Sequence, residues 1–174
     1  YDSHEYFTEV PELVNQPTKK RFWENIEATI FPKLKCVITV NEEIAEIYSK
    51  KYGVPVGVIK NVPKQLMDYK EEDSTSRDKI IIYQGALNKG RGLELLIDSM
   101  TILEGFKLFI GWDGYLVTEL KSKVTALNLS ERVHFLGRID PEILYNYTIK
   151  ASIGVSLEED LGLNYRYSLP NKVF

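Results

Sequence analysis

KIIIYQGALNKGRGLELLIDSM, residues 79–100, joins an apolar run typical of a buried strand to a glycine-rich basic loop and then to a helix with an apolar stripe. Backbone N–H groups at the start of a helix lack intrahelical partners, glycines let a ligand approach the main chain, and Arg91 adds a permanent positive charge. This combination favours an anion such as a phosphate group. A plain turn between a strand and a helix gives the same pattern, so the rest of the chain has to support the ligand.

Composition excludes several classes of protein. The chain has 174 residues, 44% hydrophobic and 27% charged, which suits one globular domain or parts of two. Its net charge of -3 argues against a general nucleic-acid binder. No apolar run is long enough to cross a bilayer, and the first residues do not resemble a signal peptide. The single cysteine, Cys36, cannot form an internal disulfide, and we expect it to be a small buried hydrophobe in a reducing, cytoplasmic setting.

The two ends of the sequence indicate a fragment. The chain opens on YDSHEYF, as though just past a strand, and closes on LPNKVF, which reads as the first turn of a helix. Without their continuations these segments would leave sheets with exposed edges. We therefore expect a piece of a larger protein.

The first sixty residues read as alternating helices and strands. Asn41 is a good N-cap, followed by two glutamates in the first turn, and Gly53 is a natural helix stop. Pro32 should end or distort the helix before it. The predicted elements are a helix at 19–34, a strand at 36–40, a helix from 42 to about 52 and a strand at 56–59. The apolar face expected on the first helix consists of Phe22, Trp23, Ile26, Ile30 and Phe31.

A polar stretch at 64–78, containing KEEDSTSRD, is the best candidate linker, because it offers little to bury. Beyond it the alternation is regular, which predicts an α/β fold with a Rossmann-like parallel sheet and right-handed crossovers. The predicted strands are 79–84, 106–110, 133–136 and 152–156, and the predicted helices are 91–103, 116–127 and 141–150.

Topology strengthens the anion hypothesis. In a doubly wound sheet of order 3-2-1-4, ligands bind outside the carboxyl ends of the strands, where the first strand meets the fourth. The loops at 85–92 and 157–170 would meet there, and the second ends in a helix initiated by proline, whose N-terminus could also bind an anion. Two helix N-termini at one crevice favour a diphosphate.

The C-terminal block resembles the donor-binding domain of GT-B glycosyltransferases, specifically the retaining enzymes of group 1 or family 4. The resemblance rests on YQGALNKGRGLELLIDSM, FKLFIGWDGYL, ERVHFLGRID and SLPNKVF, which occur in the family's order and spacing. The first block is similar to the last third of the family's acceptor domain. The resemblance implies the end of an acceptor-side domain at 1–63, a linker at 64–78 and a donor-binding domain at 79–174 that is truncated at its C-terminus.

By the same resemblance, the loop at 85–92, called the glycine loop below, would hold the donor diphosphate through Gly85, Gly90, Arg91 and Gly92. Ala86 stands where the family has a basic residue. The phosphates would then rely on Arg91, on backbone N–H groups and on Lys89 or Lys172.

The fourth loop departs further from the family pattern. The family commonly has two glutamates, eight positions apart; Tyr167 takes the place of the first, and the second would follow Phe174. Glu158 and Glu159 are out of register, and we expect them in a solvated acidic turn. The SLPNK sequence resembles a branch of the family in which the nucleotide and sugar would be faced by Asn164, Ser168, Leu169, Asn171 and Lys172.

Further residues of the site are implied by the resemblance. Arg138 and Ile139 would border the nucleobase, and His4 would be the acceptor-side histidine facing the cleft, although a lone histidine beside aromatics also suits packing or a surface position. Asp113 could bond a ribose hydroxyl, and the turn role is the simpler one. The implied catalytic residues are His4, Arg91 and Lys172, with no metal.

The function that follows is transfer of a sugar, with retention, from a nucleotide-diphosphate donor to an acceptor hydroxyl in polysaccharide or glycoconjugate synthesis. We expect no cofactor beyond the donor substrate, a saccharide or lipid-linked acceptor, no nucleic-acid partner, and a cytoplasmic location compatible with peripheral contact at the inner face of the membrane. The fragment alone is expected to be inactive. Two alternatives remain open: a nucleotide-sugar epimerase of the same architecture, and a non-catalytic nucleotide-binding module.

Overall fold

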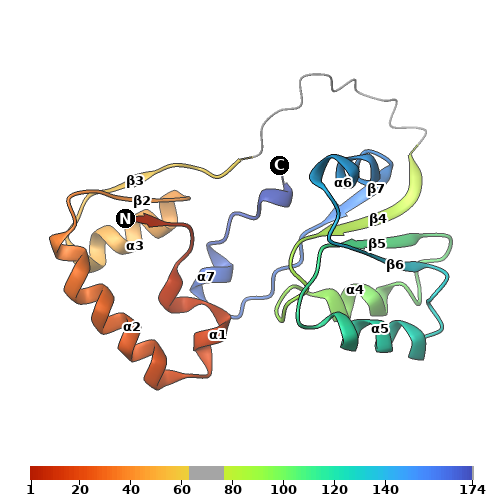
Figure 1. Ribbon diagram of the computed structural model, residues 1–174, viewed down its shortest axis with the longest axis horizontal. Coiled ribbons are helices and arrows are strands. Elements are labelled where there is room, and N and C mark those ends of the chain that lie inside the picture. Colours follow the sequence, from red (N-terminus) through yellow and green to blue (C-terminus); the bar gives the residue numbers. More distant parts are fainter. Residues whose placement is uncertain (63–76, 174) are drawn as a thin grey trace. The chain divides into compact units, whose positions relative to one another are not determined.

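A computed structural model describes residues 1–62 and 77–173. The contacts divide these residues into two compact units (Figure 1). The first contains residues 1–62 together with Glu158–Lys172, and the second contains residues 77–157 and Val173. The predicted linker lies outside the described residues, except for its last two positions. The contacts group residues 158–172 with the first unit, whereas the sequence analysis placed them in the donor-binding domain. The domain ranges inferred from the sequence stay a prediction.

The first unit is built on a small parallel sheet of order β1-β2-β3. Its strands are β1 (Asp2–Ser3), β2 (Val37–Thr39) and β3 (Val56–Val58). Its helices and 3-10 turns are η1 (Phe7–Glu9), α1 (Pro11–Val14), α2 (Pro17–Ile30), η2 (Phe31–Lys33), α3 (Glu42–Tyr52), α7 (Leu163–Arg166) and η4 (Asn171–Val173, of which Val173 groups with the second unit).

The predicted helix boundaries of α3 are confirmed. The Asn41 side chain accepts a hydrogen bond from the N–H of Ile44 at 2.9 Å, and Gly53 ends the helix with a φ of 67°. Both are the expected chemistry of a capped helix, because Asn satisfies an orphan donor and Gly adopts the left-handed conformation without a steric penalty. Pro32 likewise follows the end of α2, where the chain tightens into η2.

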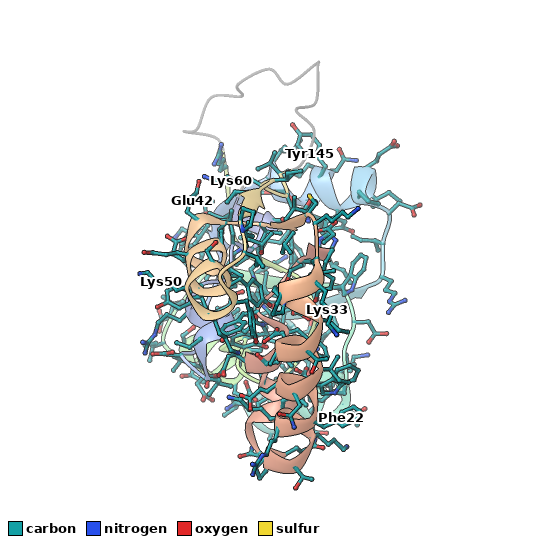
Figure 2. The ribbon with its side chains drawn as sticks, turned by 90° about the vertical axis from the view of Figure 1, so that its left-hand side faces the viewer. Phe22, Lys33, Glu42, Lys50, Lys60 and Tyr145 are labelled. Carbon is teal, nitrogen blue, oxygen red and sulfur yellow. The ribbon has the colours of Figure 1, made fainter. Side chains whose placement is uncertain are left out.

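The predicted apolar face of α2 is wrong at most of its positions. Phe31 is buried, but Phe22, Trp23 and Ile30 are exposed, and Phe22 projects from the helix (Figure 2). Among the described residues, α2 packs mainly against α1, η1 and η2 rather than against the sheet. The apolar spacing was therefore a correct signal for a helix and a poor one for burial.

Cys36 is exposed, so the expectation of a buried cysteine is also wrong. The strand begins one residue later, at Val37, and Cys36 lies outside the alternation of buried and exposed strand positions. Its carbonyl accepts a hydrogen bond from the amino terminus of Tyr1 at 2.9 Å.

The core of the first unit is rich in aromatic side chains. Tyr6 and Phe31 are buried together with Tyr48 of α3. Leu163 and Tyr167, from the segment after the second unit, pack against this core. A segment distant in sequence thereby becomes part of the first unit.

The second unit is a four-stranded parallel sheet of order β6-β5-β4-β7. Numbered along the unit, this is the predicted order 3-2-1-4. The predicted fold class is confirmed. Figure 1 shows α4 and α5 on one face of the sheet and α6 on the other. The elements are β4 (Asp78–Gln84), α4 (Leu93–Ser99), β5 (Lys107–Gly111), α5 (Val117–Ala126), β6 (Val133–Gly137), α6 (Pro141–Thr148) and β7 (Ala151–Val155).

The core of the second unit lies between the sheet and the pair α4 and α5. Tyr83 of β4, Ile97 of α4, Leu108 of β5 and Leu120 of α5 are all fully buried there. Leu87, which belongs to the glycine loop, is also fully buried in this core and fixes the loop to it. Within the described part of the chain, no helix is both long enough and apolar enough to span a membrane.

Candidate functional site

The glycine loop connects the end of β4 to the start of α4, as the sequence predicts. Gly85, Gly90 and Gly92 have φ values of 139°, 80° and 64°. L-residues with a side chain rarely adopt these backbone angles, so glycine is required by the path of the loop. Gly90 and Gly92 are also buried. The loop is a defined structure and could present its backbone to a ligand at close range.

Gly92 lies against the first residues after β7. A Cβ added to Gly92 would come within 2.6 Å of the carbonyl oxygen of Leu157. This contact joins the loop after the first strand of the unit to the loop after the fourth, at the switch point of the sheet. The first residue of the predicted loop at 157–170, Leu157, therefore contacts the loop at 85–92, as the sequence predicted.

A second loop, GWDGYL, braces the glycine loop from the end of β5. Gly114 packs so closely that a Cβ on it would lie 2.4 Å from the carbonyl oxygen of Leu87. The backbone hydrogen bonds between the loops run from Gly85 N–H to Gly111 O (3.1 Å), from Leu87 N–H to Asp113 O (3.0 Å) and from Leu116 N–H to Leu87 O (3.1 Å). A further bond runs from Lys89 N–H to the side-chain hydroxyl of Tyr115 (2.8 Å). The structure thus adds Gly114 and Tyr115 as supports that the sequence analysis did not identify.

The cations of the glycine loop differ in exposure. Lys89 is exposed, and Arg91 is half-buried immediately before the glycine that precedes α4. The carbonyl of Ala86 accepts a hydrogen bond from the Tyr83 hydroxyl at 3.0 Å. Ala86 therefore supports the loop through its backbone, while any phosphate charge would fall to the cations and the N–H groups.

The ends of β5 and β6 carry an aromatic residue and a cation that contact one another. The guanidinium of Arg138 lies over the Trp112 ring, 5.7 Å from its centre. Trp112 has a φ of 106°, an unusual angle for a bulky residue, and its N–H donates to the carbonyl of Gly137 at 2.8 Å. Ile139 is half-buried next in sequence. No feature of the local sequence indicates this conformation, because bulky residues rarely adopt a positive φ.

Asp113 takes the simpler of its two predicted roles. Its carboxylate accepts a hydrogen bond from the N–H of Gly114 at 2.8 Å. This bond stabilises the turn that places Gly114 against Leu87. The ribose role stays a prediction.

Glu158 and Lys172 form an ion pair in the first unit. Lys172 Nζ lies 2.7 Å from Glu158 Oε1, and each side chain is 11% exposed. The expectation that Glu158 lies in a solvated turn is therefore wrong. The reason is tertiary: η4 brings Lys172 back beside the start of the segment.

Asn164 ties the same segment to the start of the chain. Its Oδ1 accepts a hydrogen bond from the N–H of Tyr6 at 2.9 Å, and it is buried. The Asn41 side chain, in turn, donates to the carbonyl of Tyr167. Ser168 donates to the carbonyl of Tyr165 at 2.9 Å and, like Leu169, is half-buried, whereas Asn171 is exposed. The predicted donor residues of this segment thus lie in the unit that holds the predicted acceptor residue.

His4 follows β1 and is open to solvent. Its side chain is 70% exposed, with Nε2 3.2 Å from a carboxylate oxygen of Asp2. It lies two residues before Tyr6, whose N–H binds Asn164. The structure therefore leaves His4 accessible near the 158–172 segment.

The helix predicted after Pro170 is a 3-10 turn over Asn171–Val173 in the described residues. The segment also contains a short helix, α7, that the sequence analysis missed. Gly162 immediately precedes this helix, with a φ of 150°. Of the two helix N-termini expected at the switch point, the described residues provide a full α-helix only at α4.

A buried charged cluster stabilises the first unit. Glu27 accepts hydrogen bonds from Lys51, at 3.1 Å, and from the Tyr52 hydroxyl. Burial, and then the bond to Glu27, raise the pKa of Tyr52. Burial alone would lower the pKa of Lys51, but its hydrogen bonds to Tyr52 and Glu27 outweigh that effect and raise it. In the part of the chain that the structure describes, no three His, Cys, Asp or Glu side chains are grouped to hold a metal ion.

Comparison with known proteins gives a family match and a fold. Residues 65–164 match a family model described as glycosyl transferases group 1. No curated protein sequence matches the chain at a significant level.

Solved structures share the fold at low sequence identity. TarM of S. aureus, in complex with Fondaparinux, alpha-GlcNAc-glycerol and UDP, is 17% identical with a TM-score of 0.65, over 80% of this chain and 28% of that chain. Sucrose-phosphate synthase from Thermosynechococcus elongatus is 23% identical with a TM-score of 0.63, over 87% and 42%. Anabaena Alr3699/HepE, in complex with UDP and glucose, is 15% identical with a TM-score of 0.55, over 80% and 41%. The chain spans between 28% and 42% of the length of these proteins.

Proposed function

Since the chain belongs to the group 1 glycosyl transferases, we propose that the protein transfers a sugar from a nucleotide-diphosphate donor to an acceptor hydroxyl, with retention. The proposal extends to the synthesis of a polysaccharide or glycoconjugate. TarM and HepE were solved with UDP, which supports a nucleoside diphosphate as the product that leaves the donor site.

The observation that carries the proposal is the glycine loop at the switch point. Three glycines with positive φ hold the loop open at the carboxyl end of β4, and Gly92 abuts Leu157 beyond β7. Ligands of doubly wound sheets bind at this position. The N–H groups of Gly85, Leu87 and Lys89 bind the GWDGYL loop, so an anion would be bound by the remaining N–H groups of the glycine loop.

Arg91 supplies the charge that the reaction needs. As the bond between sugar and diphosphate breaks, negative charge grows on the leaving phosphate, and a fixed cation stabilises that charge more than it stabilises the bound substrate. The guanidinium is permanently charged and its forked donors match phosphate oxygens. Gly85, Gly90 and Gly92 would bring the main chain to the same phosphates.

The acceptor side is assigned to His4. Its imidazole is accessible to solvent, and histidine is the usual residue for moving a proton near neutral pH. In this proposal the acceptor is a saccharide or a lipid-linked saccharide, no cofactor is needed besides the donor, and the protein acts in the cytoplasm or at the inner face of the membrane.

The test is titration of the chain with UDP, GDP and ADP by calorimetry. We expect at least one of them to bind, and Arg91→Ala to weaken it roughly 10- to 100-fold, because a hydrogen bond to a charged group is lost. Lys107→Ala is the matched control. Lys107 is an exposed cation at the amino end of β5, whereas the glycine loop lies at the carboxyl ends of the strands of the same sheet. Its loss should change the affinity less than about two-fold.

Equal effects of Arg91→Ala and Lys107→Ala would contradict the assignment of Arg91. Absence of binding by all three nucleotides would contradict the proposed function itself. Retention is tested in the full-length protein, by determining the anomeric configuration of the product by NMR. Incubation with donor alone distinguishes a transferase from an epimerase, since only the latter releases an epimerised sugar.

A further inference from the structure

Trp112 occupies a backbone conformation that its side chain disfavours. Its φ of 106° is rare for a bulky residue, and such angles persist only where the surroundings hold them in place. Here the Trp112 N–H binds Gly137 O at 2.8 Å, while the carbonyls on either side, of Gly111 and Asp113, accept hydrogen bonds from the glycine loop. Hydrogen bonds from both neighbouring loops therefore hold this conformation despite its cost in free energy.

Burial of the Trp112 side chain does not offset the free-energy cost of this backbone conformation. Trp112 is 40% exposed, so a large part of the indole faces solvent. The contact that the structure gives its ring is with the guanidinium of Arg138, 5.7 Å from the ring centre and itself on an exposed residue. An exposed indole held beside a cation, on a strained backbone, has the properties of a ligand-contacting surface.

The position of the indole relative to the glycine loop indicates the ligand. Gly111 and Asp113 hydrogen-bond to Gly85 and Leu87, so Trp112 lies within one residue of two direct links to the loop. All of these residues belong to the second unit. A nucleotide whose phosphates lie on the glycine loop would carry its planar base within reach of this ring.

We propose that Trp112, whose ring lies beside Arg138, is the surface on which the nucleobase of the donor stacks. The inference rests on the proposed function, because it takes the glycine loop as the diphosphate site. Stacking of a base on an aromatic ring tolerates any base, so this contact contributes affinity for nucleosides in general. It contributes nothing to binding of the phosphates alone.

The first experiment uses fluorescence. The chain has two tryptophans, Trp23 and Trp112, and Trp23→Phe leaves Trp112 as the sole indole. In this variant we expect whichever of UDP, GDP and ADP binds tightest to change the Trp112 emission on titration, and pyrophosphate to leave it unchanged. In the converse variant, Trp112→Phe, the emission of Trp23 should not respond to the nucleotide.

The second experiment measures affinity and stability together. Trp112→Leu should weaken the nucleoside diphosphate roughly 5- to 50-fold and leave pyrophosphate affinity unchanged, while Trp112→Phe should retain most of the nucleotide affinity. Trp112→Gly should lose nucleotide affinity to a similar extent yet unfold at an equal or higher urea concentration, because glycine relieves the backbone strain. A purely structural tryptophan would give the opposite result, a loss of stability with no selective loss of nucleotide.

Two results would overturn the inference. If Trp112→Leu binds the nucleotide as the wild type does, while Arg91→Ala still weakens it, the stacking role is wrong and the proposed function stands. If the three nucleotides all fail to bind the wild type, both fall together.

Discussion

Lys172 Nζ lies 2.7 Å from Glu158 Oε1, and the two side chains are each 11% exposed. The two residues are 14 positions apart, at the start and the end of the segment that packs onto the first unit. A charge removed from water in this way depends on its partner, because a buried ion that loses its counter-charge pays the full desolvation penalty. Lys172 is thus both a predicted donor-site cation and one half of an ion pair that joins the two ends of the segment.

Removal of both members of this pair should lower the free energy of unfolding by less than the sum of the two single removals. We expect Glu158→Gln and Lys172→Met each to lower the free energy of unfolding of the first unit by roughly 1–3 kcal/mol, and the double variant to lower it by clearly less than the sum. Urea unfolding followed by the emission of Trp23, in a Trp112→Phe background, measures this unit.

The control cycle uses a pair from the same segment. Arg166 and Asp160 also form an ion pair, but both side chains are 56% exposed. Solvent screens such a pair, and we expect a coupling energy clearly smaller than that between Glu158 and Lys172. Equal coupling in the two cycles would refute the claim that burial makes the Glu158–Lys172 pair important.

Gly92 and Gly53 separate two reasons for a glycine. Their φ values are nearly equal, 64° and 67°, but a Cβ on Gly92 would meet Leu157 O at 2.6 Å whereas a Cβ on Gly53 would meet nothing within 4 Å. Gly53→Ala should therefore cost only the left-handed conformation, about 1–2 kcal/mol. Gly92→Ala adds a clash with backbone and should cost roughly 2–5 kcal/mol. Urea unfolding of each variant, followed by the tryptophan of its own unit, makes the comparison, and similar losses would show that the contact with Leu157 is unimportant.

The order of the second sheet could be predicted because it follows from local signals and one topological rule. Each strand from β4 to β7 is an apolar run bounded by a loop, and right-handed crossovers then limit the possible arrangements. The cap at Asn41 and the stop at Gly53 were likewise predicted, since their chemistry lies within a few residues of sequence. The glycine loop was recognised for the same reason.

Burial and strain were not predictable in this way. Phe22 and Phe31 share one apolar pattern, yet Phe31 is buried and Phe22 is 60% exposed, because burial depends on which elements pack against α2. The sequence suggests a surface position for Glu158, but in the folded chain η4 places Lys172 beside it. The φ of Trp112 is imposed by hydrogen bonds to Gly137 and the glycine loop, and no property of a tryptophan indicates it.

Gly114 should also be intolerant of a side chain, for a different reason. It lies outside the set of glycines with positive φ, but its Cβ would fall 2.4 Å from the carbonyl oxygen of Leu87. Gly114→Ala must displace the backbone of the glycine loop, and we expect it to lower the free energy of unfolding by about 1–3 kcal/mol and to weaken nucleotide binding as well.

The control for Gly114 is Gly154 in β7, where an added Cβ meets nothing within 4 Å. Gly154→Ala should change stability by less than about 1 kcal/mol in either direction, because alanine restricts the unfolded chain and fits the strand. Calorimetry with the nucleotide that binds the wild type completes the test. If Gly114→Ala binds it normally, the GWDGYL loop does not shape the phosphate site.

The hydroxyl of Tyr52 should make the free energy of unfolding of the first unit fall with pH in the alkaline range. Burial and the hydrogen bond to Glu27 raise the pKa of its hydroxyl above the ordinary value, so the folded state keeps a proton that the unfolded state releases near pH 10. The sign follows from linkage: the contribution is complete below about pH 10 and is lost as the pH rises through the folded-state pKa. The difference in free energy of unfolding between wild type and Tyr52→Phe should be constant, at about 1–2 kcal/mol, from pH 7 to 9 and should shrink steadily above pH 10. Because the other tyrosines are common to both proteins, their titration cancels in this difference, and a difference that stays constant to about pH 11.5 would mean that Tyr52 titrates alike in the folded and unfolded states.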